Sequence, residues 1–250
     1  MTSHLPTVGL DAFDAWLFDL DGVLTDTAEV HAAAWKLAFD PVLAEESERR
    51  TSPVAAFDPV DDYLRYVDGR PRADGVRTFL DARGIRLGEG HPGDGPSART
   101  VCGIANGKND LVRHILDTRG VRVFPGAVTL LHALRARRVR TAVVSASENT
   151  GAVLRSGGIS DLIDVCVDGI VVRERCLAGK PAPDSYLEAA RMLEVPPARA
   201  VVVEDALVGV EAGRSGRFGL VVGVDHGGQA AELIEHGADV VVSDLADLVP

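Results

Sequence analysis

The pattern of apolar and polar positions divides the chain into two kinds of segment. After Gly120, short valine-rich runs alternate with helix-like segments; the runs are RTAVVS, DVCVDG, RAVVVED, GLVVGV and ADVVVSD, and an upstream run, WLFDLD, is of the same kind. A parallel strand covered on both faces needs a continuous apolar run, and intervals of about 10 to 20 residues suit crossover helices. The pattern predicts an α/β fold built on a parallel sheet.

Residues 27–119 contain no comparable valine run. This segment begins with the helix-like stretch AEVHAAAWKLAFD, is interrupted by prolines, and crosses the Gly/Pro-rich stretch LGEGHPGDGPSART. We interpret it as a mostly helical insertion after the first strand, so that residues 1–26 and 120–250 form an α/β core domain and residues 27–119 a helical cap domain. The loop at residues 88–99 is either mobile or ordered against a ligand.

Composition narrows the class of partner. The 250 residues carry a net charge of −11, which argues against nucleic-acid or anionic-membrane surfaces because these partners are bound mainly by excess Lys and Arg. The three cysteines lack CxxC spacing, so we expect reduced thiols rather than a disulfide framework or a zinc cluster. No secretory signal and no apolar run of about 20 residues is found. A cytoplasmic enzyme is the expectation.

Two aspartates follow the first predicted strand. Side chains at i and i+2 of an extended segment point the same way, so Asp19 and Asp21 should project together from the carboxyl end of the sheet, where ligands bind. Two such carboxylates are tolerable if a divalent cation lies between them, and hard oxygen ligands suit Mg²⁺. Gly22 permits the turn that follows. An ordinary strand-to-turn junction explains DLDG equally well when the motif is taken alone.

Polar residues also follow two other predicted strands or loops. Ser145 follows a strand, and Ser147 and Asn149 open the next helix, where hydroxyls and free N–H groups make a phosphate cradle or a simple N-cap. Lys180 lies between glycine and proline in GKPAPD, as expected of a positioned point charge, although a single lysine is more often a surface residue.

A fourth signal leads to a family resemblance. Glu204 and Asp205 end an apolar strand, where they either complete a metal site or cap the next helix. The motifs DLDGV, the serine after the second strand, KPAPD and VEDALVGVEAG occur in the order and context of the haloacid dehalogenase superfamily. Within it, DGVLTDTAEVHAAAWK, SASEN and GKND resemble the β-phosphoglucomutase group. The resemblance implies a Rossmann-like parallel-sheet core and a cap that closes over the substrate and excludes water.

The resemblance also implies chemical roles for the core residues. Asp19 would be the nucleophile that becomes an aspartyl-phosphate, and Asp21 the general acid and base. Ser145 and Lys180 would neutralise the phosphoryl group. One Mg²⁺ would be held by Asp19, the backbone carbonyl of Asp21, Asp205 and, in or beside the shell, Glu204.

Further residues would contact the sugar phosphate. The resemblance assigns this role to Thr25, Asp26, His31, Arg72, Lys108, Ala146, Ser147 and Asn149. Arg72 would grip the distal phosphate, although Arg70 is close enough to be confused with it, and His31 among alanines is more often a packing residue. GIANGKND resembles a shortened phosphate loop but has one residue too few between its glycines, so we reject nucleotide binding. Glu148 departs from the group pattern, where many relatives carry a basic residue.

The implied activity is the interconversion of β-D-glucose 1-phosphate and glucose 6-phosphate, with β-glucose 1,6-bisphosphate as intermediate and activating phosphodonor. A Mg²⁺-dependent sugar-phosphate phosphatase is the alternative, which Glu148 and a cap longer than in the compact mutases keep open. A module that only binds phosphosugars is a third hypothesis, and the intact set of nucleophile and acid/base argues against it. We expect a monomer whose partner is a small sugar phosphate, with a metabolic link to a disaccharide phosphorylase.

Overall fold

The structure, a computed structural model, describes residues 9–226 and 228–250. Six parallel strands form one sheet in the order β3-β2-β1-β4-β5-β6. The strands are β1 (Ala15–Phe18), β2 (Arg140–Val144), β3 (Val165–Val167), β4 (Ala200–Glu204), β5 (Leu220–Val224) and β6 (Val240–Val242). Each predicted run overlaps one of these strands, so the α/β, parallel-sheet prediction is confirmed.

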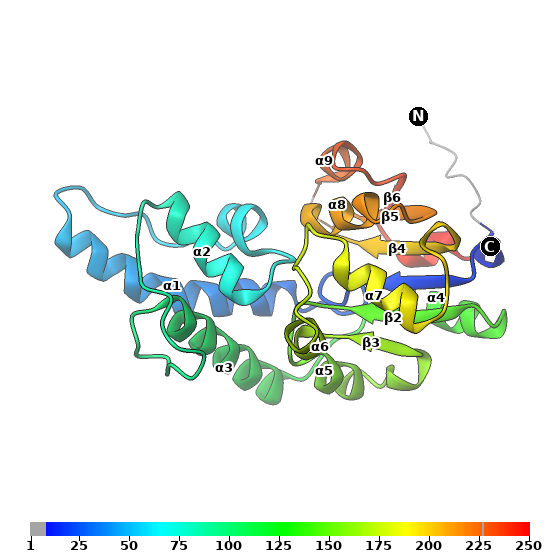
Figure 1. The fold of residues 1–250 in the computed structure, drawn as a ribbon, viewed down its shortest axis with the longest axis horizontal. Helices are drawn as coiled ribbons and strands as arrows, with labels where there is room; N and C mark the ends of the chain where they lie inside the picture. The colour runs from blue at the N-terminus through cyan, green and yellow to red at the C-terminus, as the bar shows by residue number, and fades with distance from the viewer. Residues whose placement is uncertain (1–8, 227) are drawn as a thin grey trace. The chain divides into compact units, whose positions relative to one another are not determined.

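The chain forms two compact units, which we describe separately. The core unit comprises the residues up to Asp26 together with Val121–Pro250, and the helical unit comprises Thr27–Gly120. Residues 1–8, which the prediction placed in the core domain, and Gly227 lie outside the described residues. The helices of the core unit are α4 (Pro125–Ala136), α5 (Thr150–Ser156), α6 (Gly169–Glu174), α7 (Asp184–Met192), α8 (Leu207–Ser215) and α9 (Ala230–Glu235) (Figure 1).

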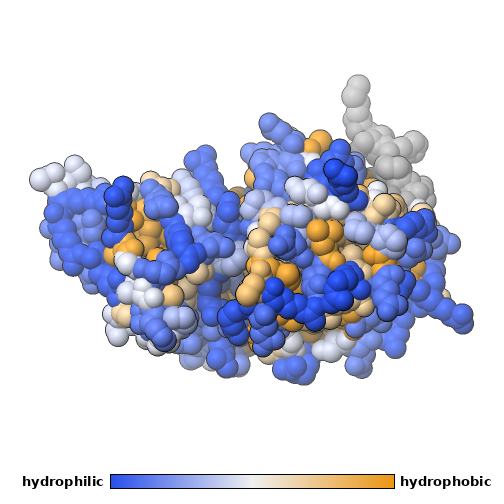
Figure 2. All heavy atoms as spheres, viewed as in Figure 1, coloured by the Kyte–Doolittle hydropathy of each residue, from blue (hydrophilic) through white to orange (hydrophobic). Residues whose placement is uncertain are grey.

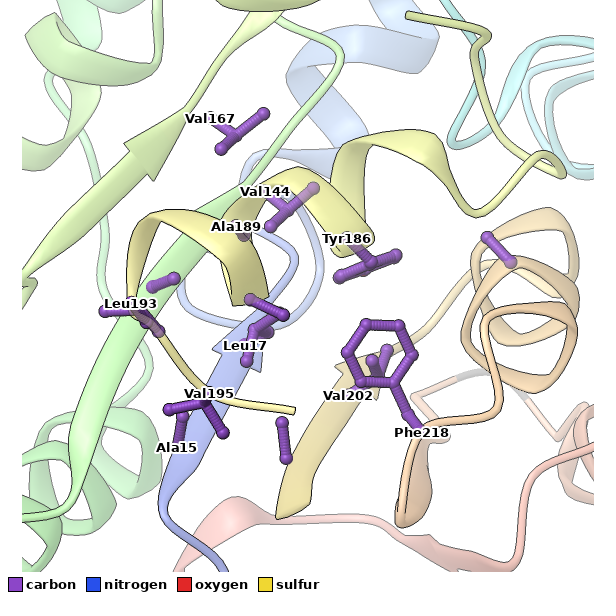
Figure 3. Packing of buried hydrophobic residues seen from close by; sticks show 14 residues of the cluster. Ala15, Leu17, Val144, Val167, Tyr186, Ala189, Leu193, Val195, Val202 and Phe218 are labelled. Carbon is purple, nitrogen blue, oxygen red and sulfur yellow. The ribbon is translucent and has the colours of Figure 1, made fainter. Parts of the chain in front are cut away.

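The core of the sheet explains why the strands are apolar throughout. All four residues of β1 are fully buried, and β1 pairs with β2 on one side and β4 on the other. Leu17 shares one face with Val144 and Val202, and α7 packs on that face through Tyr186 and neighbouring alanines (Figure 3). Because successive side chains alternate, Trp16 and its neighbours face the other side, so both faces require apolar residues.

The helical unit contains three long helices and one short turn of π-helix. These are α1 (Ala28–Arg49), the π-helical turn η2 (Tyr63–Val67), α2 (Arg72–Ala82) and α3 (Val101–Arg119). Short 3₁₀ turns in the core unit lie at Leu10–Ala12, Ser160–Leu162, Pro197–Arg199 and Leu245–Leu248.

Helix α1 is longer than the sequence pattern predicted because it continues past Pro41. A proline inside a helix costs about 3 kcal/mol. Trp35, Phe39 and Leu43 are buried along one stripe of α1, and the Phe39 ring lies 4.2 Å from that of Phe79 on α2. Burial of each such side chain contributes about 1.5–3 kcal/mol, so packing outweighs the cost of the proline.

The Gly/Pro-rich loop is tied to the beginning of α3. Asp94 accepts a hydrogen bond from the Thr100 hydroxyl, and the Asn106 amide donates to the carbonyls of Pro92 and Asp94. Gly103 lies against the loop, because a Cβ there would be 2.2 Å from the Ala98 carbonyl oxygen. In this structure the loop is ordered by the protein itself, and GIANGKND is the interior of a helix rather than a phosphate loop.

Hydrophilic residues cover most of the face of each unit that is seen in Figure 2, with apolar residues between them. Within the described part of the chain, no helix is both long and apolar enough to cross a membrane.

Candidate active site

Asp19 lies directly beyond β1, and only 7% of its surface is exposed. Its N–H donates to the Val203 carbonyl, which continues the pairing of β1 with β4 by one residue. The chain then turns sharply at Gly22, where φ is +85° and a Cβ would lie 1.7 Å from an oxygen of Asp205. Only glycine satisfies both requirements, so this turn brings the β1 and β4 ends into contact.

Lys180 is buried between two carboxylates. Its Nζ lies 2.5 Å from Asp19 Oδ1 and 2.6 Å from Glu204 Oε1, and it also donates to the Val144 carbonyl at 3.3 Å. It therefore joins the carboxyl ends of β1, β2 and β4. The expectation of a positioned charge is confirmed, and the surface-residue interpretation is wrong for this lysine, which is 5% exposed.

Glu204 is fully buried and held by four protein donors. Lys180 and the Tyr186 hydroxyl, at 2.8 Å, donate to Oε1, while the N–H groups of Asp205 and Ala206 donate to Oε2 at 3.1 Å each. Gly209 of α8 lies against this carboxylate, because a Cβ there would be 1.8 Å from Oε1. The orientation of Glu204 is thus fixed by its surroundings.

Burial dominates the electrostatics of this cluster. Burial raises the pKa of the Asp19 carboxyl to about 8; Lys180 opposes the rise, and Glu204 and Asp21 add to it. Burial alone would lower the pKa of Lys180, but Asp19 and Glu204 together raise it above its usual value, so the lysine remains a cation. Burial and then Glu204 hold the pKa of Tyr186 well above its usual value, so its hydroxyl is a donor.

Three carboxylates in this cluster fit a metal ion. Asp19, Glu204 and Asp205 each offer an oxygen within 4.8 Å of the others. Three carboxylates against one lysine leave the cluster anionic when all are ionised, which favours a cation beside them. Oxygen donors of this kind suit a hard divalent ion. The side chain of Asp21 is outside this group; its predicted contribution was a backbone carbonyl, which stays a prediction.

Ser145 is buried at the end of β2, next to the carbonyl that accepts from Lys180. Its hydroxyl accepts from the Ser147 N–H at 3.1 Å, and the Ser147 hydroxyl accepts from the Asn149 N–H at 3.2 Å. Residues 145–149, with Ala146 between the two serines, thus form a compact turn before α5. Glu148 in this turn pairs with Arg173 of α6, which offsets its negative charge.

Two other predicted contact residues lie beyond the Gly22 turn. Thr25 is fully buried and its hydroxyl donates to the Leu20 carbonyl at 3.0 Å. Asp26 forms an ion pair with Arg122. Their contact with a sugar stays a prediction.

In the helical unit, His31 is paired with Lys108. His31 Nδ1 lies 3.0 Å from Lys108 Nζ, and that ammonium lies 4.8 Å from the centre of the Trp35 ring. Lys108 is 7% exposed. His31 is therefore in direct contact with a second predicted functional residue. Arg72 is the first residue of α2.

Sequence reasoning missed three residues of the site. Tyr186 and Gly209 contact Glu204, and His226 Nε2 lies 2.7 Å from the Gly22 carbonyl oxygen. Tyr186 lies in the first turn of the helix after KPAPD, and a search for apolar or aromatic residues there could have found it. No local signal marks His226.

The site combines acidic side chains at the carboxyl ends of parallel strands with a buried lysine, and a helical unit is inserted after the first strand. The sequence model of the haloacid dehalogenase-like hydrolase family matches residues 13–217 of this chain. The chain belongs to this family. It is 51% identical over 238 residues to a β-phosphoglucomutase of Mycobacterium tuberculosis. The aligned region covers 94% of this chain and 91% of that relative.

Two further comparisons each cover more than nine-tenths of the chain. The crystal structure of a β-phosphoglucomutase from Clostridium difficile matches with a TM-score of 0.71 and 26% identity, over 94% of this chain and 93% of that one. A validoxylamine A 7'-phosphate phosphatase of Streptomyces hygroscopicus subsp. limoneus is 30% identical, over 93% of this chain and 94% of that protein.

Proposed function

We propose that this protein is a β-phosphoglucomutase that interconverts β-D-glucose 1-phosphate and D-glucose 6-phosphate. The observation that carries the proposal is the 51% identity to the mycobacterial β-phosphoglucomutase over almost the whole chain. The buried Lys180 between Asp19 and Glu204 supports it, because phosphoryl transfer needs a positioned cation beside the acceptor carboxylate.

Asp19 acts as the nucleophile. One of its oxygens attacks phosphorus in line, the bond from phosphorus to the sugar oxygen breaks, and an aspartyl-phosphate forms. Lys180 and Ser145 bind the phosphoryl oxygens as their charge develops. Asp21 gives its proton to the departing sugar oxygen, and in the second half-reaction it takes a proton from the attacking sugar hydroxyl.

Asp19, Glu204 and Asp205, with the backbone carbonyl of Asp21, would hold one Mg²⁺. When bound, the ion would supply positive charge that offsets the phosphoryl charge and favours the ionised form of Asp19, whose pKa burial otherwise raises to about 8.

The helical unit acts as the cap. It closes over the core unit and excludes water, so that the aspartyl-phosphate reacts with a sugar hydroxyl rather than with water. Arg72 binds the second phosphate of β-glucose 1,6-bisphosphate, which reorients before it gives up the other phosphate. The remaining sugar-phosphate contacts are those of Thr25, Asp26, His31, Lys108, Ala146, Ser147 and Asn149.

The β anomer suggests the reaction that supplies the substrate. Inverting phosphorolysis of an α-linked disaccharide yields β-glucose 1-phosphate, so a disaccharide phosphorylase is the proposed metabolic partner. We further propose that the protein works as a cytoplasmic monomer, with β-glucose 1,6-bisphosphate as the activating phosphodonor.

A coupled assay tests the proposal. Pure protein is incubated with β-glucose 1-phosphate, Mg²⁺ and a trace of β-glucose 1,6-bisphosphate, and glucose 6-phosphate and free phosphate are followed in parallel. α-Glucose 1-phosphate is the substrate control, and Asp19→Ala is the matched inactive variant. Formation of glucose 6-phosphate much faster than phosphate, from the β anomer alone, is the expected result.

A sugar-phosphate phosphatase is the second candidate. The phosphatase from Streptomyces hygroscopicus subsp. limoneus favours it, because a protein 30% identical over nearly the whole chain carries that name. The same Asp19 chemistry then ends with water attacking the aspartyl-phosphate. Phosphate release without glucose 6-phosphate in the assay would replace the first proposal with this one.

A further inference from the structure

His226 follows β5 and contacts the turn beyond the two aspartates. Its Nε2 lies 2.7 Å from the Gly22 carbonyl oxygen. A carbonyl oxygen only accepts hydrogen bonds, so Nε2 carries a proton and donates it. This contact joins residues 204 positions apart in the sequence.

The imidazole ring has a second support. It stacks on Phe124 with the ring centres 4.7 Å apart and an angle of 17° between the planes. Phe124 in turn is bound to the same turn, because its N–H donates to the Leu24 carbonyl at 3.0 Å. His226 is thus held on Phe124 in the position from which it donates to Gly22.

The turn that His226 supports carries Asp21. The Gly22 N–H donates to the Thr25 carbonyl at 2.8 Å, and the Gly22 carbonyl accepts from His226, so both sides of this peptide segment are bound. Gly22 has no side chain to hold the turn, and its φ of +85° belongs to a region that glycine enters freely. The direction of the Asp21 side chain depends on the backbone of this turn.

We propose that His226 is a positioning residue for Asp21, acting through the Gly22 carbonyl. The inference rests on the proposed function, in which Asp21 is the general acid and base. Loss of the His226 donor leaves the nucleophile Asp19 and Lys180 in place but lets the Asp21 turn shift. The step that needs a proton should therefore suffer more than the step that does not.

Two phosphodonors separate these steps. With β-glucose 1,6-bisphosphate, the bond from phosphorus to the sugar oxygen breaks, and that oxygen takes the proton of Asp21. With acetyl phosphate, the bond from phosphorus to the acetate oxygen breaks, and acetate leaves as an anion without a proton. Both reactions phosphorylate Asp19, so their ratio reports on Asp21 alone.

The variants separate the hydrogen bond from the stacking. His226→Phe keeps an aromatic ring against Phe124 but has no donor, and His226→Gln keeps an N–H donor but has no ring. His132→Phe, at an exposed position of α4, is the matched control. Asp21→Ala serves as the reference for complete loss of the acid. Thermal denaturation checks that each variant is folded.

Rapid-quench measurement of phospho-enzyme and steady-state mutase kinetics give the readouts. For His226→Phe we expect kcat for β-glucose 1-phosphate and phosphorylation by the bisphosphate to fall about 10- to 100-fold, as for a displaced general acid. KM and phosphorylation by acetyl phosphate should change less than about threefold. His226→Gln should recover most of kcat, since one N–H donor replaces another.

Two results would overturn the role of His226. One is a His226→Phe variant with the kcat of the wild type, and the other is an equal loss with both phosphodonors. If His226→Phe does not fold, His226→Leu takes its place, because it also lacks a donor. A wild-type protein that forms no glucose 6-phosphate refutes the proposed function instead, which the His226 variants do not affect.

Discussion

Replacing Gly209 with alanine should destabilise the core unit, although alanine is the better helix former. In a helix such as α8, glycine to alanine stabilises by about 1 kcal/mol. The added Cβ, however, would lie 1.8 Å from Glu204 Oε1 and 1.9 Å from its Cδ, so the carboxylate or the helix must move. Lys180 and Tyr186 hold that carboxylate at 2.6 Å and 2.8 Å, which prevents a cheap rotation.

The cost can be worked from these contacts. Forcing a methyl group into a packed interior costs about 1–3 kcal/mol. Weakening one hydrogen bond to a buried charge costs about 1.5–3 kcal/mol more. After subtraction of the gain in helix propensity, Gly209→Ala should lower the free energy of unfolding by about 1.5–5 kcal/mol. For a protein of this size, the midpoint of thermal unfolding should then fall by roughly 3–20 °C.

Tryptophan fluorescence can report on the core unit alone. The chain has two tryptophans, Trp16 in β1 and Trp35 in the helical unit, so a Trp35→Phe background leaves only the fully buried Trp16. Urea unfolding of Gly209→Ala is compared with Gly151→Ala of α5, where the nearest atom to the new Cβ is Arg155 Nη1 at 3.4 Å. Gly151→Ala should be neutral or stabilising by up to about 1 kcal/mol.

The outcome that refutes this reasoning is a Gly209→Ala protein at least as stable as its parent. It would mean that Glu204 relaxes freely and that its four donors do not fix its position.

Four further predictions concern the chemistry. Asp19→Ala should abolish both mutase turnover and formation of the labelled phospho-enzyme. Full turnover in this variant would contradict the nucleophile assignment. Arg72→Ala should raise KM for β-glucose 1,6-bisphosphate about tenfold or more, because a charge-assisted phosphate contact is lost, whereas Arg70→Ala should change it little; the reverse order would move the assignment to Arg70. Removal of metal with EDTA should abolish mutase activity, and Mg²⁺ should restore it; activity in EDTA equal to that in Mg²⁺ would exclude the metal role. Burial and then Asp168 raise the pKa of Cys166 to about 11, so roughly one-thousandth of this thiol should be thiolate at pH 8. Its alkylation by iodoacetamide, measured by mass spectrometry, should therefore be slower than that of the exposed Cys176. The rate of alkylation of Cys166 should rise about tenfold per pH unit up to about pH 11.

The sheet could be predicted because its physical requirement is local. The central strands β1 and β4 are buried throughout, so they had to be continuous apolar runs, and all six predicted runs overlap strands of the sheet. The end of α1 could not be predicted, because Pro41 is a local signal against a helix and the packing of Phe39 and Phe79 that overrides it is distant in sequence.

The candidate site divides in the same way. Asp19, Lys180, Glu204 and Asp205 each follow a strand or lie in a loop with a recognisable local pattern, and the parallel topology brings them together. The sequence left His31 open between a packing residue and a functional one, and only the fold places its Nδ1 3.0 Å from Lys108 Nζ.

The amino-acid sequence by itself determined which segments become strands, and which charged residues stand where those strands end. Periodicity and chain direction are properties of neighbouring residues, so they can be read locally. Only the tertiary structure decided that Tyr186 holds Glu204, that Gly209 leaves room for that carboxylate, and that His226 supports the turn after Asp21. These contacts join residues up to 204 positions apart. They form, and contribute to stability, only after the sheet has brought its strand ends together.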